Sequence, residues 1–277
     1  MKHKIKMIGL DMDGTLLTTE KKLTAYTRQV LEKAMAQGIE VVLSTGRSLT
    51  GIPKEILELP GMKYAVTING ARIMDLKNQK ILYESMLSRE TALKLLDIIS
   101  EYDAIQEAFI DSVCYSSKDK LEHVGDFFLN PGAVEYVLKS RTPVEDVKAI
   151  VLQKEMPVDK VNGIFKSAKD KKSSYERLSK VPGVVIVSSF RNNWEINAEG
   201  TDKGNALLRL GNFLGIRREE IMACGDSMND LAMLKAVGLG VAMANADPEV
   251  KKTADYITAS NNEDGVAKAI EKFALEA

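Results

Sequence analysis

The chain has 277 residues, of which 45% are hydrophobic and 28% charged, and its formal net charge is -1 at pH 7. These values are ordinary for a globular protein with a sizeable core, built as one large domain or two. The balanced charge argues against nucleic acid or an anionic membrane as a partner, so we expect a small-molecule ligand.

Two further classes of protein are not expected. No apolar run approaches the roughly 20 residues that span a bilayer, and the N-terminus leads into a strand instead of a signal-peptide core, which predicts a cytoplasmic protein. Cys114 and Cys224, the only cysteines, lie far apart and indicate neither a disulfide framework nor a zinc site. The only histidines, His3 and His123, lie in no catalytic pattern, so a Ser-His-Asp hydrolase is not expected.

The first expected strand, residues 5–10, is short and mostly apolar, as in the centre of a parallel sheet. Asp11 and Asp13 follow it, at the carboxyl end where open α/β sheets bind their ligands. Gly14 allows the backbone to turn away and Thr15 adds a hydroxyl. A stretch of this kind is more often a solvated turn, so its meaning depends on which other polar groups converge on it.

A second polar group follows the next strand. A helix is expected over residues 24–37, then a strand over residues 39–43 that ends in Ser44-Thr45-Gly46-Arg47. Hydroxyls beside a glycine at a strand end can donate to an anion that the backbone approaches closely. From this stretch alone, a cap for the following helix is an equally good interpretation of Thr45.

A third strand is expected at residues 64–68, and the segment after it is expected to form the edge of the first domain. Asn69-Gly70 comes next and is typical of a hairpin turn. Residues 73–75 and 81–83 then predict two short strands joined through residues 77–79.

The pattern changes between residues 84 and 190, where helical and strand segments alternate loosely and no acidic cluster follows a strand. We interpret residues 84–190 as a second domain, inserted into a first domain formed by residues 1–83 and 191–277. The basic run at residues 169–172 predicts a solvated turn. Arg141, Arg191 and Asn192 could reach a polar ligand, but surface positions are the favoured interpretation. Nothing in this segment identifies a substrate.

The first domain resumes with a short expected strand at residues 194–197 and a helix that ends at Gly215. Lys203 lies in the first turn of that helix, where the helix dipole disfavours a cation by about 0.3–1 kcal/mol. An anion bound there would remove the conflict. Asp202 could also soften it, so a surface lysine remains an alternative.

The third acidic group follows a buried strand at residues 221–224. Asp226 would lie at the strand end, and a helix starting at about Ser227 would turn Asp230 towards the same pocket. The glycines at 238 and 240 loosely match a dinucleotide fingerprint, but they fall in an expected strand and not in a strand-to-helix turn, so we reject that interpretation. Residues 255–257 and a helix over 266–273 would complete the core.

One pocket accounts for all of these groups, because each follows a different strand of the expected parallel sheet. Carboxylates without histidine or cysteine suit a hard cation with oxygen ligands, and Mg²⁺ fits. A lysine and helix-start amides beside that cation indicate a phosphate. Asp11 and Asp13 could then divide hydrolysis between them, one attacking phosphorus and the other transferring the proton.

Four ordered motifs resemble those of the haloacid dehalogenase superfamily: residues 11–15, 44–47, 203–204 and 225–230. The long insertion between the second and third motifs makes the chain most similar to the Cof-type sugar phosphatases, across nearly its full length. The resemblance implies an α/β fold, in which a smaller α/β cap domain is inserted into a Rossmann-like parallel-sheet core. The cap would close over the core and contact the leaving group.

The resemblance also implies roles for individual residues. Asp11 would form an aspartyl-phosphate, and Asp13 would act as general acid and base. Mg²⁺ would be held by the Asp11 carboxylate, the Asp13 backbone carbonyl and Asp226, with Asp230 in support. The phosphoryl oxygens would be bound by Thr45, Gly46, Lys203, Asn229 and the Met12 amide. The substrate pocket would include Arg47, Asn69 and Gly70.

The implied activity is that of a Mg²⁺-dependent phosphomonoesterase acting on small phosphorylated metabolites, sugar phosphates above all. A phosphomutase shares the nucleophile and the second aspartate but returns the phosphoryl group to its substrate, and the core motifs do not separate the two. A non-catalytic phosphate-binding protein is a third alternative, against which the intact Asp11 and Asp13 argue. The sequence indicates neither the natural substrate nor the oligomeric state.

Overall fold

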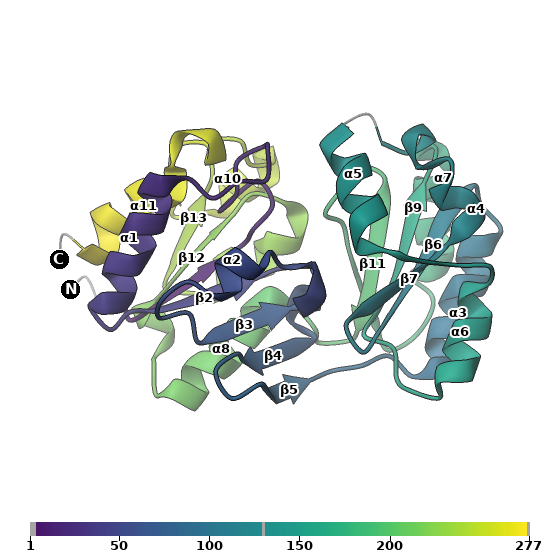
Figure 1. The fold of residues 1–277 in the computed structure, drawn as a ribbon, viewed down its shortest axis with the longest axis horizontal. Coiled ribbons are helices and arrows are strands. Elements are labelled where there is room, and N and C mark those ends of the chain that lie inside the picture. The colour runs from purple at the N-terminus through teal and green to yellow at the C-terminus, as the bar shows by residue number, and fades with distance from the viewer. Residues whose placement is uncertain (1–3, 129–130, 276–277) are drawn as a thin grey trace. The chain divides into compact units, whose positions relative to one another are not determined.

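The chain folds into two compact units, each with its own sheet (Figure 1). In this computed structural model, residues 4–128 and 131–275 are described. The first unit, called the core domain below, runs to Arg47, includes Ile52–Glu84 and resumes at Asp202. The second unit, called the cap domain, comprises Ser85–Thr201 together with Ser48–Gly51.

The core domain is built on an eight-stranded sheet that is parallel over six neighbouring strands and antiparallel at one edge. The antiparallel edge is the hairpin predicted on either side of residues 77–79, and the Asn69-Gly70 turn joins it to the parallel part. In order across the sheet, the strands are β14 (Tyr256–Ile257), β13 (Leu239–Ala242), β12 (Ile221–Gly225), β1 (Met7–Leu10), β2 (Glu40–Ser44), β3 (Tyr64–Thr67), β4 (Arg72–Asp75) and β5 (Lys80–Glu84).

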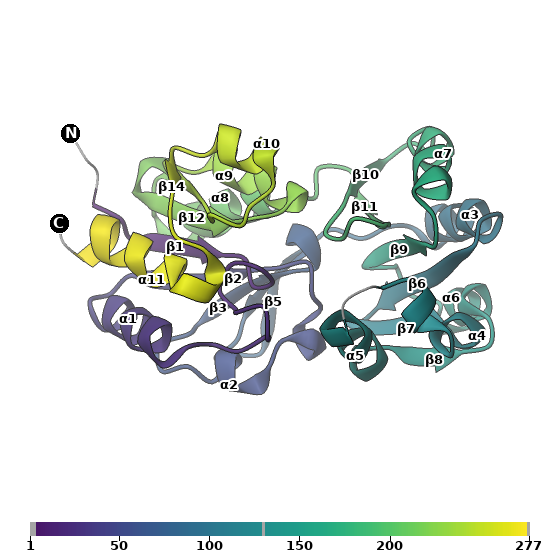
Figure 2. The same ribbon diagram turned by 90° about the horizontal axis from the view of Figure 1, so that it is seen from above.

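Helices cover both faces of this sheet, which is why its central strands are apolar throughout. Helices α1 (Ala25–Ala36) and α11 (Gly265–Ile270) contact each other, as do α8 (Lys203–Leu214) and α9 (Leu231–Ala236). Figure 2 shows these two pairs on opposite sides of the sheet. Two further helices of the core domain are α2 (Lys54–Leu57) and α10 (Pro248–Thr253). Among the described residues, no helix is both long and apolar enough to cross a membrane.

The cap domain has a six-stranded sheet that is antiparallel except for one parallel pair, β7 with β8. Its larger hydrophobic core lies between the sheet and helices α3 (Arg89–Ser100), α6 (Val147–Lys154) and α7 (Ala168–Leu178). Two further helices are α4 (Lys118–Leu121) and α5 (Pro131–Ser140). Across the sheet, the strands are β10 (Val184–Val187), β11 (Asn193–Ala198), β9 (Lys160–Phe165), β6 (Ala104–Ile110), β7 (Val113–Ser117) and β8 (Thr142–Val144).

Two expectations about this region were wrong. The strand expected at residues 194–197 is β11, which pairs with β9 and β10 of the cap sheet, so the first domain resumes near Asp202 and not at residue 191. The sequence of β11 is consistent with this pairing, because Asn193, Glu195 and Asn197 alternate with apolar residues. Such alternation is typical of an antiparallel strand and not of a parallel strand covered on both faces. The basic run at residues 169–172 is not a turn, because it lies inside α7.

Candidate active site

The register of the central strands brings the predicted motifs to one edge of the core sheet. Leu10, the last residue of β1, pairs with Leu43 of β2 on one side and with Cys224 of β12 on the other. The Asp11 N–H extends this pairing by donating to the Cys224 carbonyl at 3.1 Å. The segments that begin at Asp11, Ser44 and Gly225 therefore leave the sheet side by side.

Lys203 joins two of the acidic groups. Its fully buried Nζ lies 2.6 Å from Asp11 Oδ1 and 2.7 Å from Asp230 Oδ1. Burial opposes the charge of Lys203, but the two carboxylates outweigh it and hold the pKa of the amine above its ordinary value. The surface alternative for this lysine is therefore wrong, and the carboxylates of Asp11 and Asp230 lie beside its charge.

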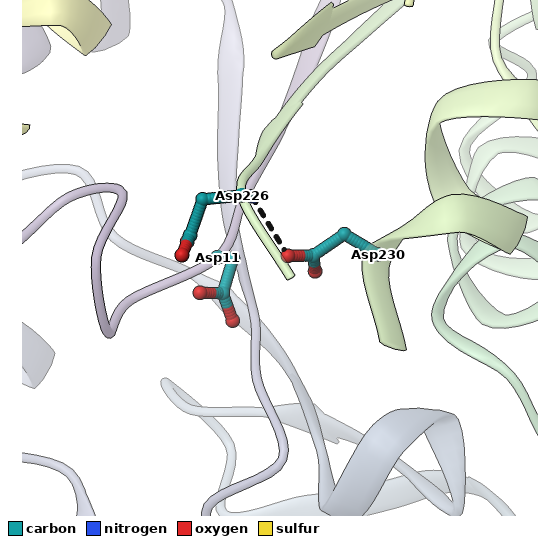
Figure 3. Close-up of side chains that lie close together, drawn as sticks. All are labelled: Asp11, Asp226 and Asp230. Carbon is teal, nitrogen blue, oxygen red and sulfur yellow. Dashed lines mark hydrogen bonds between the residues drawn. The ribbon is translucent and has the colours of Figure 1, made fainter. Parts of the chain in front are cut away.

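Three carboxylates converge on a place that suits a metal ion. Asp11, Asp226 and Asp230 each offer an oxygen, and these oxygens lie within 4.8 Å of one another (Figure 3). A set of oxygen ligands without nitrogen or sulfur fits a hard cation such as Mg²⁺. Gly14, with φ +82°, lets the chain pass this group closely, because a Cβ there would lie 2.5 Å from Asp226 Oδ2.

The charges of these acids support the same interpretation. Burial, followed by the charge of Asp230, raises the pKa of Asp226 to about 7. Burial also raises the pKa of Asp11 well above its ordinary value, although the charge of Lys203 opposes the shift. A divalent cation among them would remove this conflict by stabilising the ionised carboxylates. The residues present therefore fit Mg²⁺.

Asp226 and Asp230 differ in how they are held. Asp230 Oδ2 accepts the backbone N–H groups of Asp226 and Ser227, both at 3.0 Å, while its other oxygen faces Lys203. Asp226 instead accepts hydroxyls, from Thr15 at 2.6 Å and from Ser227 at 3.1 Å. Asp230 thus fixes the loop around Asp226.

Asp13 lies in a different electrostatic environment from Asp11. Arg47 forms two hydrogen bonds with its carboxylate, Nε to Oδ2 and Nη2 to Oδ1, both at 2.7 Å, and Lys21 Nζ lies 2.5 Å from Oδ1. Burial alone would raise the pKa of Asp13, but the bonds and charges of Arg47 and Lys21 hold it well below its ordinary value. Two carboxylates two residues apart therefore have opposite environments, an arrangement that can divide chemical roles between them.

The remaining predicted residues lie in four segments, which follow β1, β2, β3 and β12, and Asn69 contacts two of the other segments. The Thr45 carbonyl accepts the Asn69 N–H at 3.0 Å, and Asn229 Nδ2 donates to Asn69 Oδ1 at 3.2 Å. Met12 is fully buried directly after Asp11, and Gly46 and Gly70 directly follow Thr45 and Asn69. Among the residues expected in the substrate pocket, Arg47 is engaged with Asp13.

Sequence reasoning gave no partner for three residues that hold these side chains: Lys21, Thr15, of which it noted only the hydroxyl, and Ser227. Thr15 and Ser227 stand inside the recognised motifs, so the motifs could have drawn attention to them. Lys21 gives no such signal, because it is one of two adjacent lysines in a polar loop.

The expectation for Arg141 was wrong. Arg191 is exposed as expected, but the Arg141 side chain is 5% exposed and pairs with the fully buried Glu107 of β6. Glu107 also accepts from Asn162 at 2.6 Å, and Lys160 pairs with Glu195 on the neighbouring strand. Glu107 lies 34 positions from Arg141 in sequence, so no local pattern around Arg141 could reveal that the arginine is buried.

Comparison with known proteins places the chain in a family. Residues 8–270 match the model of the haloacid dehalogenase-like hydrolases. The putative phosphatase YxeH of Bacillus subtilis is 32% identical over 98% of both chains. The 5-amino-6-(5-phospho-D-ribitylamino)uracil phosphatase YcsE of the same organism is 35% identical over 98% of this chain and 96% of its own.

The fold agrees as well. A haloacid dehalogenase-like hydrolase from B. subtilis superposes with a TM-score of 0.86 at 30% identity, covering 96% of this chain and 99% of its own. This match confirms the predicted α/β class, and the relatives confirm the prediction of a phosphatase. The chain belongs to the haloacid dehalogenase-like hydrolase family.

Proposed function

We propose that the protein is a Mg²⁺-dependent phosphomonoesterase that hydrolyses small phosphorylated metabolites, sugar phosphates above all, through an aspartyl-phosphate on Asp11. The observation that carries this proposal is the pair of contrasting carboxylates: Asp11 lies beside Lys203 and two further acids, and Asp13 beside Arg47 and Lys21. A protein that only binds phosphate has no need of this contrast.

In the first step, the Asp11 carboxylate attacks phosphorus, the bond from phosphorus to the leaving oxygen breaks, and Asp13 gives that oxygen a proton. In the second step, Asp13 takes a proton from water, the water oxygen attacks phosphorus, and the Asp11 carboxylate is released with inorganic phosphate. The structure holds Asp13 as a carboxylate, which is the form needed for the second step. Protonation of Asp13 for the first step therefore requires that its hydrogen bonds with Arg47 and Lys21 weaken.

The surrounding groups would bind the phosphoryl oxygens. Lys203 supplies a fixed positive charge 2.6 Å from the nucleophile, and Thr45, Gly46, Asn229 and the Met12 amide would complete the set of donors. Mg²⁺, held by the Asp11 carboxylate, the Asp13 carbonyl and Asp226 with Asp230 in support, would supply further positive charge beside these oxygens.

The choice of substrate class is supported by the relatives. The relative YcsE is named for a substrate whose phosphate sits on a ribityl chain, a small polyhydroxylated group. The near-neutral charge of the whole chain also suits a small metabolite better than a polyanion. A cytoplasmic location stays a prediction.

Release of inorganic phosphate from a panel of sugar, polyol and nucleoside phosphates tests this proposal, first with Mg²⁺ and then with a chelator. We expect metal-dependent release from the sugar and polyol phosphates. The matched control is Asp11→Asn, which should abolish release and prevent trapping of an acyl-phosphate while the protein remains folded. Conversion of a sugar phosphate into its isomer without phosphate release would indicate a phosphomutase, and binding without turnover would indicate a non-catalytic protein.

A further inference from the structure

The loop between β3 and β4 has an unusual backbone. Ile68, Asn69 and Gly70 are consecutive residues with positive φ, at +53°, +58° and +99°. The left-handed region is natural for glycine and tolerated by asparagine, but it is rare for a β-branched residue such as isoleucine. All three residues are buried, so the conformation is imposed by packing and not by exposure at a free surface. Strain of this kind is concentrated at functional sites.

Backbone hydrogen bonds fix one side of this left-handed turn. The Ile68 N–H donates to the Arg47 carbonyl at 2.9 Å, and the Asn69 N–H donates to the Thr45 carbonyl at 3.0 Å. Both bonds join the turn to the loop that follows β2. The turn therefore holds the segment that carries the Thr45 hydroxyl.

A second side of the turn lies against the start of α8. A Cβ at Gly70 would lie 2.3 Å from the Asp202 carbonyl oxygen, so only glycine fits there. Asp202 is the N-cap of α8 and the residue immediately before Lys203. The turn thus sets the distance between the Thr45 loop and the first turn of the helix that carries Lys203.

The third contact is made by a side chain. Asn69 Oδ1 accepts from Asn229 Nδ2 at 3.2 Å, joining residues 160 positions apart in sequence. Asn229 is 8% exposed and Asn69 3%, so the bond is shielded from water. Because a side-chain amide is planar, this contact fixes which edge of Asn229, the NH₂ or the carbonyl, is offered to a phosphoryl oxygen.

We infer that the left-handed turn Ile68–Gly70 is a positioning element for phosphoryl binding, in which Asn69 orients the Asn229 amide and the backbone of the turn holds the Thr45 loop. This inference rests on the proposed function, since it takes Asn229 and Thr45 as phosphoryl-binding groups. It differs from the role that the family resemblance implied, in which Asn69 lines the substrate pocket. A positioning residue affects every phosphate ester alike, whereas a pocket residue affects only those whose leaving group it contacts.

The clean variant is Asn69→Gly, because glycine accepts the positive φ and only the side chain is removed. We expect kcat/KM to fall about five- to tenfold, the effect of one lost orienting hydrogen bond, and to fall equally for p-nitrophenyl phosphate and for a sugar phosphate. In the Asn229→Ala background, Asn69→Gly should change kcat/KM by less than about twofold, because the residue it acts through is gone. Equal losses in both backgrounds, or a loss confined to sugar phosphates, would overturn the inference.

Gln79→Gly is the matched control, since Gln79 is also a left-handed non-glycine residue of the core domain, with φ +51°, but is exposed in the β4–β5 turn. It should leave the kinetics unchanged. If Asn69→Gly is too unstable to assay, Asn69→Asp replaces it. The aspartate keeps an acceptor oxygen for Asn229, so kcat should be retained, whereas its added charge should raise KM. A fall in kcat as large as that of Asn229→Ala would contradict an orienting role.

Calorimetric titration with inorganic phosphate in the presence of Mg²⁺ separates this inference from the proposed function. Wild-type protein that releases no phosphate from any ester would end the proposal of a phosphatase. The binding comparison would still decide the role of Asn69, because we expect Asn69→Gly to bind phosphate several-fold more weakly than wild type. Equal binding by the two proteins would refute the inference.

Discussion

Arg47 and Asp13 form a bidentate ion pair that is buried on the arginine side, with the Arg47 side chain 7% exposed and that of Asp13 34% exposed. The pair fixes the plane of the Asp13 carboxylate. Planar matching of this kind is specific to arginine, because a lysine ammonium cannot bond to both carboxylate oxygens in one plane.

Arg47→Met should lower kcat/KM by about 10- to 100-fold, because Asp13, the proposed general acid and base, loses the orientation of its carboxylate. The apparent Mg²⁺ affinity should stay nearly unchanged, since the arginine bonds to Asp13 and not to the three clustered acids. Lys21→Met is the control, because it removes a charge beside Asp13 that is not part of the bidentate pair. We expect it to lower kcat/KM by no more than about threefold. A large shift in the Mg²⁺ dependence of Arg47→Met would contradict this division of roles.

Lys203→Met should destabilise the protein by about 3–5 kcal/mol at neutral pH without Mg²⁺, because it leaves the buried carboxylates of Asp11 and Asp230 without their shared cation. The loss should shrink as the pH falls, since burial raises the pKa of Asp11 and its protonation removes one unpaired charge. Urea unfolding at pH 5 and pH 8 measures both effects. An equal loss at the two pH values would mean that packing, and not charge, explains the role of Lys203.

The acid cluster predicts how Mg²⁺ affects stability as the pH changes. The folded-state pKa of Asp226 is about 7, against an ordinary value of about 3.9 in the unfolded chain. Between these two values the folded protein binds more protons than the unfolded chain, so its stability without metal should fall as the pH rises from about 4 to 7. Under the proposed function Mg²⁺ binds the ionised acids, and it should then restore more stability at pH 7.5 than at pH 5.

Melting temperatures in EDTA and in Mg²⁺ across this pH range test the linkage between pH and metal. Asp226→Asn is the control, because it removes the titrating group: its melting temperature in EDTA should depend less on pH and respond less to Mg²⁺. Parallel curves for wild type in EDTA and in Mg²⁺ would contradict the prediction.

Arg141→Met in the cap domain should cost about 3–5 kcal/mol of stability, because Glu107 would remain fully buried without its cation. Changing both partners to apolar residues, Arg141→Met with Glu107→Leu, should recover most of that loss. Urea unfolding of the single and the double variant decides the matter: a double variant no more stable than the single one would show that the polar partners of Glu107, such as Asn162, dominate.

The sequence predicted the core domain better than the cap domain, and the reason is physical. Strands such as β1 and β12 are covered on both faces, so each reads as an apolar run that ends in a polar motif. In β11, polar and apolar residues alternate, and nothing local shows which sheet it joins. The long cap strand β6 carries the buried Glu107, whose partners come from other elements.

The same distinction applies to the candidate site. Asp11, Lys203 and Asp226 were identified because each stands in a recognisable motif at the end of a strand or the start of a helix. Two sets of contacts were not predicted: the ion pairs of Asp13 with Lys21 and Arg47, and the hydrogen bond between Asn69 and Asn229. Each depends on the rotamers of side chains that the fold brings together. Sequence periodicity places backbones and gives no information on such rotamers.

The pairing of β1 with both β2 and β12 has a consequence for how the protein is made. Thr15 and Asp226, which are hydrogen-bonded in the finished site, are 211 positions apart, and the whole cap domain is synthesised between them. A nascent chain therefore carries Thr15 long before it gains the strand that precedes Asp226. Contacts of such long range form slowly. The acids should thus stay apart until most of the chain has been synthesised.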